Sequence, residues 1–180
     1  AQDLARVFER DPTLTASILK LANSSFYGFN REISTISHAI VCLGFDTIKS
    51  IALAASTQDM LNDGLSAYKL EKGMLWQHST TCAICARMVA QRIKYRDCEE
   101  AYIAGLLHDI GKIILSSFAE EQYDQILEKT KDNKTPFNIA EQEVLGYDHP
   151  QIGGKIIEKW NLPPALVEAV KFHHQPEKAV

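Results

Sequence analysis

A-Y-I-A-G-L-L-H-D-I-G-K-I-I-L-S-S-F, residues 101–118, is an apolar stretch interrupted by one charged group, His108-Asp109 followed by Lys112. Small and branched residues on both sides form a pattern typical of a buried helix. An unpaired charge inside such a segment is costly, so these side chains must pair with one another or enclose a cation. Histidine nitrogens and carboxylate oxygens are common metal ligands, and a lysine one turn later can meet an anion.

The helical positions of His108 and Asp109 limit how they could share an ion. Adjacent residues point roughly 100° apart, because about 3.6 residues make one helical turn. The two side chains can therefore bind one ion only near a helix end, with further ligands arriving from other helices. This requirement directs attention to the other histidines of the chain.

Composition indicates a globular protein and excludes two classes of partner. The 180 residues, 46% of them hydrophobic, suit one domain with a sizeable core. A net charge of −4 without a basic cluster indicates no direct nucleic-acid binding. No apolar run approaches the roughly 20 residues that span a bilayer, and no signal peptide is recognised, so we expect a cytoplasmic protein without membrane contact. The chain begins without Met, so we expect that an upstream part has been removed.

The cysteines give no framework for disulfides. Cys42, Cys82, Cys85 and Cys98 are scattered over helical segments, as expected of reduced thiols in a cytosol. Cys82 and Cys85 form a C-x-x-C, but no second pair exists and the motif would lie in mid-helix. We interpret them as packed thiols rather than as a zinc or redox site.

Helix follows helix along the chain, and no alternating run of β-branched residues predicts a strand. A polar break at residues 57–66 is the expected hinge or sub-domain boundary. The sequence therefore predicts an all-α fold, an irregular multi-helix bundle. In the first third of the chain, a helix ends before Asp11, a second starts at Asp11-Pro12, a third is capped by Ser34 or Thr35 and stops at Gly44, and a fourth is capped by Asp46. A long helix follows at residues 69–93, and Asp97 and Glu100 form a capping box at the start of the next one. The last helices run from Thr135-Pro136 to a stop at Gly146, from His149-Pro150 to a stop at residues 161–163, and to an end at His173-His174.

The six histidines are more informative as a group than singly. A lone helical histidine is more often a core or capping residue than a ligand. Five of the six follow residue 70, and with Asp109 they form a set of nitrogen and oxygen donors. Such a set suits iron, manganese, zinc or nickel better than calcium or magnesium. The members of this set are His78, His108, Asp109, His149, His173 and His174.

This arrangement resembles the HD superfamily of metal-dependent phosphohydrolases, all-helical proteins named for a His…His-Asp…Asp ligand set. H-D-I-G-K at residues 108–112 is similar to a stretch of the HD-GYP cyclic-dinucleotide phosphodiesterases. The rest resembles the HDOD branch, the HD-related output domain of bacterial signalling proteins. The stretches that carry this resemblance are D-P-T-L-T-A-S-I-L-K-L-A-N-S-S at residues 11–25, I-S-T-I-S-H-A-I-V-C-L-G at 33–44 and L-G-Y-D-H-P-Q-I-G-G-K-I-I-E-K-W-N-L-P at 145–163.

The resemblance implies one HDOD-type helical domain over residues 1–180, truncated at both ends. It places N-terminal helices in residues 1–60 and an HD-like core in residues 67–180. Lys112 is similar to the lysine that faces the phosphate, which makes Lys112 and Asp109 the candidate catalytic residues. Two features depart from the HD enzymes: the closing aspartate would fall after His174, where the chain ends at Val180, and the G-Y-P sequence is absent. The first and name-giving ligands of the family match His78, His108 and Asp109, and the later ligands of its dinuclear members match His149 and His173 or His174.

Two functions from different classes follow from the resemblance. As an output domain, the chain passes a signal by packing against a receiver, sensor or effector domain, and the cluster is an inherited structural, metal-binding or nucleotide-sensing site. As an enzyme, it hydrolyses a phosphoester, with cyclic or linear dinucleotides as first candidates and iron, manganese, nickel or zinc as the metal. The output domain is the function we expect. Phe26, Tyr27 and Phe29 in the loop at residues 23–32 are a candidate contact surface, although local core packing explains them better.

Overall fold

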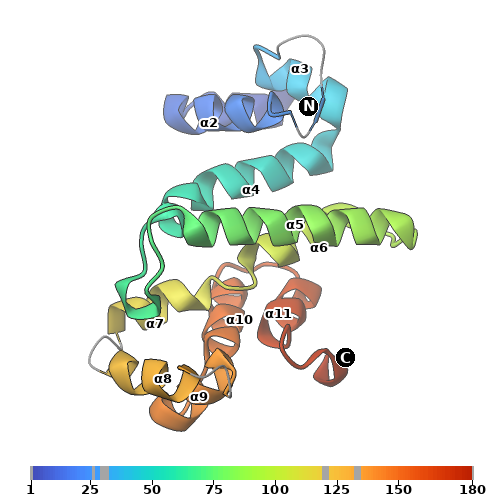
Figure 1. Ribbon diagram of the computed structural model, residues 1–180. Coiled ribbons are helices and arrows are strands. Elements are labelled where there is room, and N and C mark those ends of the chain that lie inside the picture. The colour runs from blue at the N-terminus through green and yellow to red at the C-terminus, as the bar shows by residue number, and fades with distance from the viewer. Residues whose placement is uncertain (1, 26, 29–32, 119–121, 132–134, 180) are drawn as a thin grey trace. The chain divides into compact units, whose positions relative to one another are not determined.

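The computed structural model describes residues 2–25, 27–28, 33–118, 122–131 and 135–179 (Figure 1). Within these ranges the structure is helical, and its β-structure is limited to an isolated bridge between Leu65 and Leu70. The predicted all-α class is therefore confirmed. The chain divides into two compact units, residues 1–59 and residues 60–180.

The first unit is a small helical cluster with a core of its own. Aliphatic side chains from each of its longer helices are almost fully buried together. Its helices are α1 (Gln2–Phe8), α2 (Pro12–Ala22), α3 (Ile36–Leu43) and α4 (Phe45–Asn62), the last of which continues into the second unit. The core includes Ile18, Ala22, Ile33, Ile36, Ala39, Ile48 and Ile51.

Two helices of this unit begin at the predicted caps. The Asp11 carboxylate accepts a hydrogen bond from the backbone N–H of Leu14 at 3.0 Å, at the start of α2. The Thr35 hydroxyl accepts one from the N–H of His38 at 3.2 Å, at the start of α3. Each cap satisfies a donor that the first helical turn leaves without a backbone partner.

The prediction that Asp46 caps the next helix is wrong. Helix α4 begins one residue earlier, at Phe45, because the carbonyl of Gly44 already accepts from the N–H of Ile48. Asp46 lies inside the first turn, where its carboxylate pairs with Lys49 at 2.7 Å. An acidic residue in that turn still complements the positive end of the helix dipole.

The polar break predicted at residues 57–66 is wrong in its first half, because α4 continues to Asn62. Thr57 is buried, and its hydroxyl donates to the backbone carbonyl of Leu53 at 2.9 Å. This bond satisfies the polar side chain without interrupting the helix. The boundary between the two units falls between residues 59 and 60.

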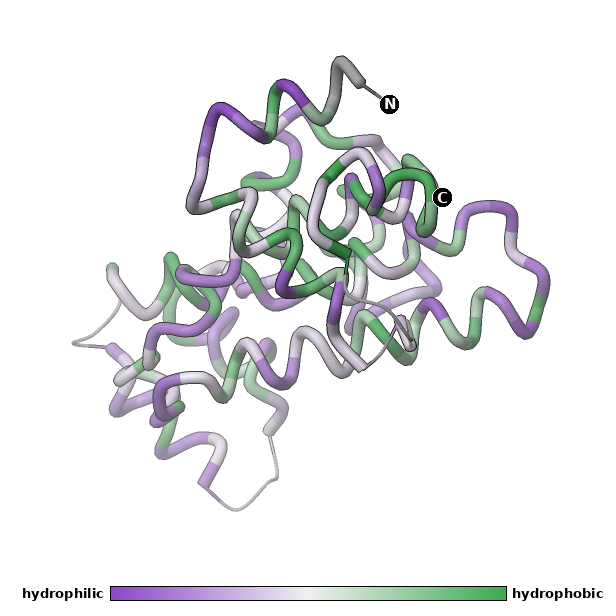
Figure 2. Tube along the Cα trace, turned by 90° about the horizontal axis from the view of Figure 1, so that it is seen from above, coloured by the Kyte–Doolittle hydropathy of each residue, from purple (hydrophilic) through white to green (hydrophobic). Residues whose placement is uncertain are grey.

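The second unit consists of helices packed in pairs. Helix α5 lies along α6, α10 packs against α7 and α11, and α8 packs against α9 (Figure 1). Polar and apolar residues follow one another along the chain (Figure 2), and an amphipathic helix packs its apolar face against its neighbours. The elements are η1 (Ser66–Tyr68), α5 (Met74–Arg92), α6 (Cys98–Leu107), α7 (Gly111–Phe118), α8 (Tyr123–Thr130), α9 (Phe137–Leu145), α10 (His149–Lys159), α11 (Pro164–Lys171) and η3 (Pro176–Lys178).

Three boundaries in this unit differ from the sequence-based expectation. The long helix begins at Met74 rather than near residue 69, because Lys69 and Gly73 have φ angles of 52° and 87° that end a helix. The segment after Asp97 forms two helices, α6 and α7, separated by residues 108–110. Helix α8 lies where no helix was predicted.

Candidate metal centre

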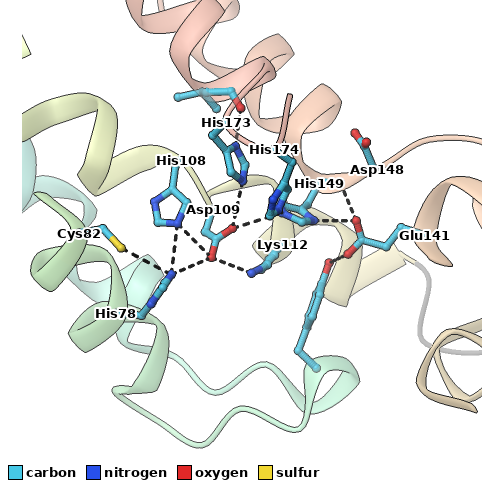
Figure 3. A network of polar contacts seen from close by, with 12 residues as sticks. His78, Cys82, His108, Asp109, Lys112, Glu141, Asp148, His149, His173 and His174 are labelled. Atoms are coloured by element: carbon cyan, nitrogen blue, oxygen red, sulfur yellow. Dashed lines mark hydrogen bonds and ion pairs between the residues drawn. The ribbon is translucent and has the colours of Figure 1, made fainter. Parts of the chain in front are cut away.

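Asp109 lies at the centre of a polar cluster in the second unit (Figure 3). It occupies the break between α6 and α7, where its backbone carbonyl accepts from the N–H of Lys112 at 3.0 Å. Its side chain is only 3% exposed. The break turns Asp109 away from the helix direction, so both carboxylate oxygens can face side chains from other helices.

The Oδ2 atom of Asp109 faces two histidines and a lysine. Nε2 of His78, from α5, is 3.5 Å away, and Nε2 of His108 is 3.4 Å away. The two imidazole nitrogens are themselves 3.2 Å apart. Nζ of Lys112 approaches Oδ2 to 2.6 Å and forms the shortest of these contacts. Figure 3 shows His78, His108 and Lys112 around this oxygen of the carboxylate.

The Oδ1 atom faces a second group of histidines. Nε2 of His149, at the start of α10, is 3.3 Å from Oδ1, and Nε2 of His173 is 3.8 Å from it. Nε2 of His174 lies 3.3 Å from Nε2 of His149. The structure therefore brings together every member of the set named from the sequence. His38 is not part of it, because it is an exposed residue of α3 in the first unit.

Second hydrogen bonds fix the tautomer of three histidines. Nδ1 of His108 is 2.8 Å from the carbonyl of Gly105, and Nδ1 of His173 is 2.7 Å from the carbonyl of Val170. A carbonyl can only accept, so Nδ1 carries the proton in both rings and a neutral ring has its lone pair on Nε2. Nδ1 of His149 donates to a carboxylate at 2.7 Å, with the same consequence.

These tautomers place lone pairs opposite lone pairs, which is unfavourable unless a proton or a cation lies between them. Burial acts to raise the pKa of Asp109, but its contacts with His108 and His149 and the charge of Lys112 outweigh it and hold that pKa far below its usual value, so the oxygens of Asp109 are ionised acceptors. Burial lowers the pKa of His173 to about 4, and that ring is neutral near pH 7. Its buried Nε2 has no hydrogen-bond partner.

The remaining histidines differ in their protonation. Burial also lowers the pKa values of His78 and His174. Burial acts to lower the pKa of His149 as well, but hydrogen bonds to Asp109 and Glu141 outweigh it and raise that pKa. A proton on His149 would satisfy one contact of Oδ1, whereas the neutral nitrogens around it would still lack a positive partner.

Glu141, from α9, is a member of the site that the sequence did not single out. It is fully buried, and its Oε2 accepts from Nδ1 of His149 at 2.7 Å and from the backbone N–H of His149 at 2.8 Å. Its Oε1 accepts from the hydroxyl of Tyr68 at 2.6 Å. Burial acts to raise the pKa of Glu141, but the bonds from His149 and Tyr68 outweigh it and lower that pKa. A carboxylate that holds the far nitrogen of a histidine is a common support of metal ligands.

Cys82 is the second residue beside the cluster that the sequence did not single out, since the C-x-x-C was interpreted as two packed thiols. Its Sγ lies 3.7 Å from Nε2 of His78. The donor atoms of His78, Cys82 and His108 are all within 4.8 Å of one another. Cys85 is exposed and is not in this group. The spacing of His78 and Cys82, four residues apart on one helix, was the signal available in the sequence.

Two glycines allow the helices that carry these side chains to approach closely. A Cβ on Gly105 would come within 2.8 Å of the Cα of Ala83, so α6 can lie directly on α5 and bring His108 to His78. A Cβ on Gly111 would overlap the backbone carbonyl oxygen of His149. The start of α7 can therefore rest on the start of α10, which places Asp109 beside His149.

A cavity of about 510 Å³ opens beside the cluster, with His108, His173 and Cys82 among its lining residues. This volume is in the range of small-molecule sites. Its other walls come from α6, α11 and the end of α5, and they are mostly apolar. They include Ala86, Ala101, Ala104, Gly105, Ala165 and Ala169.

Two further expectations bear on partners. Phe26 and Phe29 of the proposed contact loop lie outside the described residues, while Tyr27 packs against the core of the first unit. Local core packing is thus the better explanation for Tyr27. Among the described residues, none of the helices has the length and apolarity needed to cross a membrane.

Comparisons with known proteins agree with the fold and with the resemblance. An HDOD domain protein with unknown function from Geobacter sulfurreducens superimposes with a TM-score of 0.86 at 28% identity, covering 98% of this chain and 59% of that one. A Shewanella amazonensis protein with a provisional phosphohydrolase name gives 0.81 at 26% identity, covering 99% of this chain and 62% of that one. The cyclic di-GMP phosphodiesterase PA4108 of Pseudomonas aeruginosa is 32% identical over 127 residues, which are 68% of this chain and 28% of that protein.

The chain therefore spans less than two thirds of each of these three proteins. The family model of the HDOD domain matches residues 1–176, almost the full length given. On this match, the chain belongs to the HDOD domain family of signalling-type proteins.

Proposed function

We propose that this chain is a cytoplasmic output domain of bacterial signalling, which acts through protein–protein interaction and holds divalent metal ions at the cluster around Asp109. Receiver, sensor or effector domains are its expected partners. One observation carries the metal part of the proposal: nitrogen lone pairs from separate helices point at both oxygens of one buried, ionised carboxylate.

A metal ion removes the repulsion between these lone pairs and the carboxylate oxygens better than protons do. Protonating all the imidazoles would put several positive charges within hydrogen-bond distance of one another, and only Asp109 and Glu141 would balance them. An ion accepts several lone pairs at once with a single centre of charge. One ion would be held by His78, His108 and Oδ2 of Asp109, and a second by His149, His173 or His174 and Oδ1. These imidazole and carboxylate donors suit iron, manganese, nickel or zinc.

The interaction part of the proposal is supported by the family and by exposed apolar side chains. On the last turns of α5, Met88, Val89 and Ile93 are 60%, 59% and 68% exposed. Exposed apolar residues gathered near one end of a helix can take part in contacts with other proteins. We propose these residues at the end of α5 as the partner surface, in place of the aromatic loop proposed from the sequence.

The metal is tested by thermal melting of wild type and Asp109→Asn, each with and without a chelator. The wild type is expected to melt at a lower temperature with the chelator, since an ion at 100 times its dissociation constant stabilises by about 2.7 kcal/mol. Asp109→Asn should be less stable and insensitive to the chelator. Elemental analysis of protein purified without a histidine tag should find the metal in the wild type only.

Asp97→Asn is the matched control, because Asp97 caps α6 outside the cluster and asparagine caps equally well. Its melting temperature should respond to the chelator as the wild type does. If the chelator has no effect on the wild type, and Asp109→Asn is equally destabilised in both conditions, Asp109 is a structural partner of Lys112 and the metal proposal fails.

Phosphoester hydrolysis is a second candidate, favoured by the position of Lys112 beside the cluster and by the neighbouring cavity. Divalent ions there would supply Lewis-acid activation of water. Two such ions would exceed the charge of Asp109 and Glu141, so the site would attract an anion. In the structure, however, Asp109 neutralises Lys112, whose Nζ also lies 5.8 Å from the centre of the Tyr68 ring.

The two candidates are separated by assaying cyclic and linear dinucleotides and generic phosphodiesters with each metal supplied. We expect no hydrolysis by the wild type, in agreement with an output domain. Hydrolysis that disappears in Lys112→Ala, while the chelator-sensitive melt remains, would instead establish the enzyme. Lys129→Ala is the control for loss of a lysine, since Lys129 pairs with Glu143 away from the cluster.

A further inference from the structure

Cys82 occupies a position in the cluster that hydrogen bonding does not explain. Nε2 of His78 is contacted by Sγ of Cys82 at 3.7 Å, by Nε2 of His108 at 3.2 Å and by Oδ2 of Asp109 at 3.5 Å. A ring nitrogen can donate or accept only one ordinary hydrogen bond, so it cannot satisfy all three groups. Three donors gathered around one nitrogen indicate instead a common centre between them.

The distances agree with a four-coordinate ion. Tetrahedral zinc with its usual bond lengths places nitrogen or oxygen donors about 3.3 Å apart, and a sulfur about 3.6 Å from a nitrogen. The observed separations among His78, His108 and Asp109 are 3.2, 3.5 and 3.4 Å. The separation of sulfur from His78 is 3.7 Å, and all donors of His78, Cys82 and His108 lie within 4.8 Å.

The local structure delivers the thiol to this position. His78 and Cys82 are separated by four residues on α5, so their side chains lie above one another on one helical face. This is the spacing by which a single helix supplies two ligands to zinc in other proteins. Cys85 lies about one turn further along the same helix, where it is exposed and is not among these donors.

We propose that Cys82 is a fourth protein ligand of the ion held by His78, His108 and Asp109. This inference rests on the proposed metal binding and names the ligand set of one of its two ions. On binding, the S–H bond of Cys82 breaks, a metal–sulfur bond forms and the proton passes to solvent. Lys112 takes one lone-pair direction of Oδ2 and leaves another for the ion.

The thiolate makes the two halves of the centre chemically different. The half at Oδ2 has a soft sulfur ligand, which favours zinc or iron over manganese. The half at Oδ1 is formed by His149, His173 and His174, and the described donors grouped there include no sulfur. The Cys82 half should therefore discriminate between metals more strongly.

Cobalt(II) titration of metal-free wild type, Cys82→Ser and Cys85→Ser tests the ligand directly. Cobalt bound by a thiolate shows a sulfur-to-metal charge-transfer band in the near ultraviolet, whereas its visible ligand-field bands report binding by any ligands. The wild type and Cys85→Ser should show both. Cys82→Ser should lose the charge-transfer band and keep visible bands from ions held by the imidazoles and Asp109.

The possible failures are distinguishable. If the wild type shows visible bands without a charge-transfer band, the protein binds metal but Cys82 is not a ligand. A charge-transfer band that is lost only in Cys85→Ser would lead to the same conclusion. The absence of both kinds of band would overturn the metal centre itself. X-ray absorption of the zinc-loaded wild type needs no variant to fold. It should show a zinc–sulfur distance of about 2.3 Å, from the one of the two ions that Cys82 binds, and a shell of nitrogen and oxygen alone would contradict the proposal.

Discussion

Each oxygen of the Asp109 carboxylate faces several side chains at once. These side chains must therefore be held in fixed orientations by other hydrogen bonds. A backbone carbonyl orients His108 and another orients His173, while Glu141 orients His149. Each of these bonds fixes which ring nitrogen carries the proton. The lone pairs that face Asp109 are thus set by groups outside the cluster, and these supporting groups should matter nearly as much as the ligands.

Glu141→Gln is the sharpest test of such support. Glu141 accepts from four hydrogen donors: the backbone N–H and Nδ1 of His149, and the hydroxyls of Tyr68 and Tyr123. A glutamine must turn its NH₂ group toward some of them, which replaces attraction by repulsion. We expect zinc affinity to fall by about 10- to 100-fold, measured by calorimetric titration.

Glu143→Gln is the matched control, because Glu143 lies two residues further along α9 and its carboxylate is exposed. This variant should leave the zinc affinity unchanged. Glu141→Gln should also lower the melting temperature of the metal-free protein, since it disturbs a buried network. Lower stability with unchanged zinc affinity would mean that Glu141 supports the fold without positioning His149.

At the scale of helices, the sequence predicted which residues of the cluster lie together better than it predicted the helix boundaries. The requirement that His108 and Asp109 lie near a helix end follows from helical geometry alone, and the structure has the break between α6 and α7 at these residues. The caps at Asp11 and Asp97 were also predictable, because they depend on residues next to one another in sequence.

What could not be predicted depends on residues distant in sequence. Glu141 reads as an ordinary polar residue of an amphipathic helix until α9 packs beside Tyr68 and His149. Gly105 and Gly111 likewise read as breaks in an apolar run, and only the packed structure shows that their missing Cβ atoms let α5 and α10 approach. The sequence does not show which distant residues come into contact, so these roles can be seen only in the folded structure.

At the scale of the whole molecule, the centre joins helices that are far apart in the sequence of the second unit. Its proposed ligands come from α5, the α6–α7 break, the start of α10 and the segment that follows α11. An ion bound there links these elements directly, so metal binding should stabilise residues 60–180 as one cooperative body. Trp76 and Trp160 both lie in this unit, so tryptophan fluorescence reports its unfolding selectively.

The pH dependence of that unfolding follows from the shifted histidines. Burial gives His173 a folded pKa of about 4, below its value of 6.5 when unfolded. Between pH 6.5 and 4 the unfolded chain therefore takes up a proton that the folded chain does not, and stability falls as pH falls. The full shift corresponds to about 3 kcal/mol. The lowered pKa values of His78 and His174 act in the same direction.

His149 has the opposite sign, because its pKa is raised in the folded protein: its contribution is complete below pH 6.5 and is lost as pH rises through the folded pKa. Denaturant unfolding of the metal-free protein, followed by tryptophan fluorescence, should therefore show greatest stability near neutral pH and a decline toward pH 4. His173→Gln should flatten that decline, whereas His38→Gln, on the exposed face of α3, should not alter it. Adding zinc should steepen the decline, because protons then compete with the ion for the same nitrogens. A decline that is equally steep in His173→Gln and unaffected by zinc would show that the cluster neither titrates nor binds metal as its geometry implies.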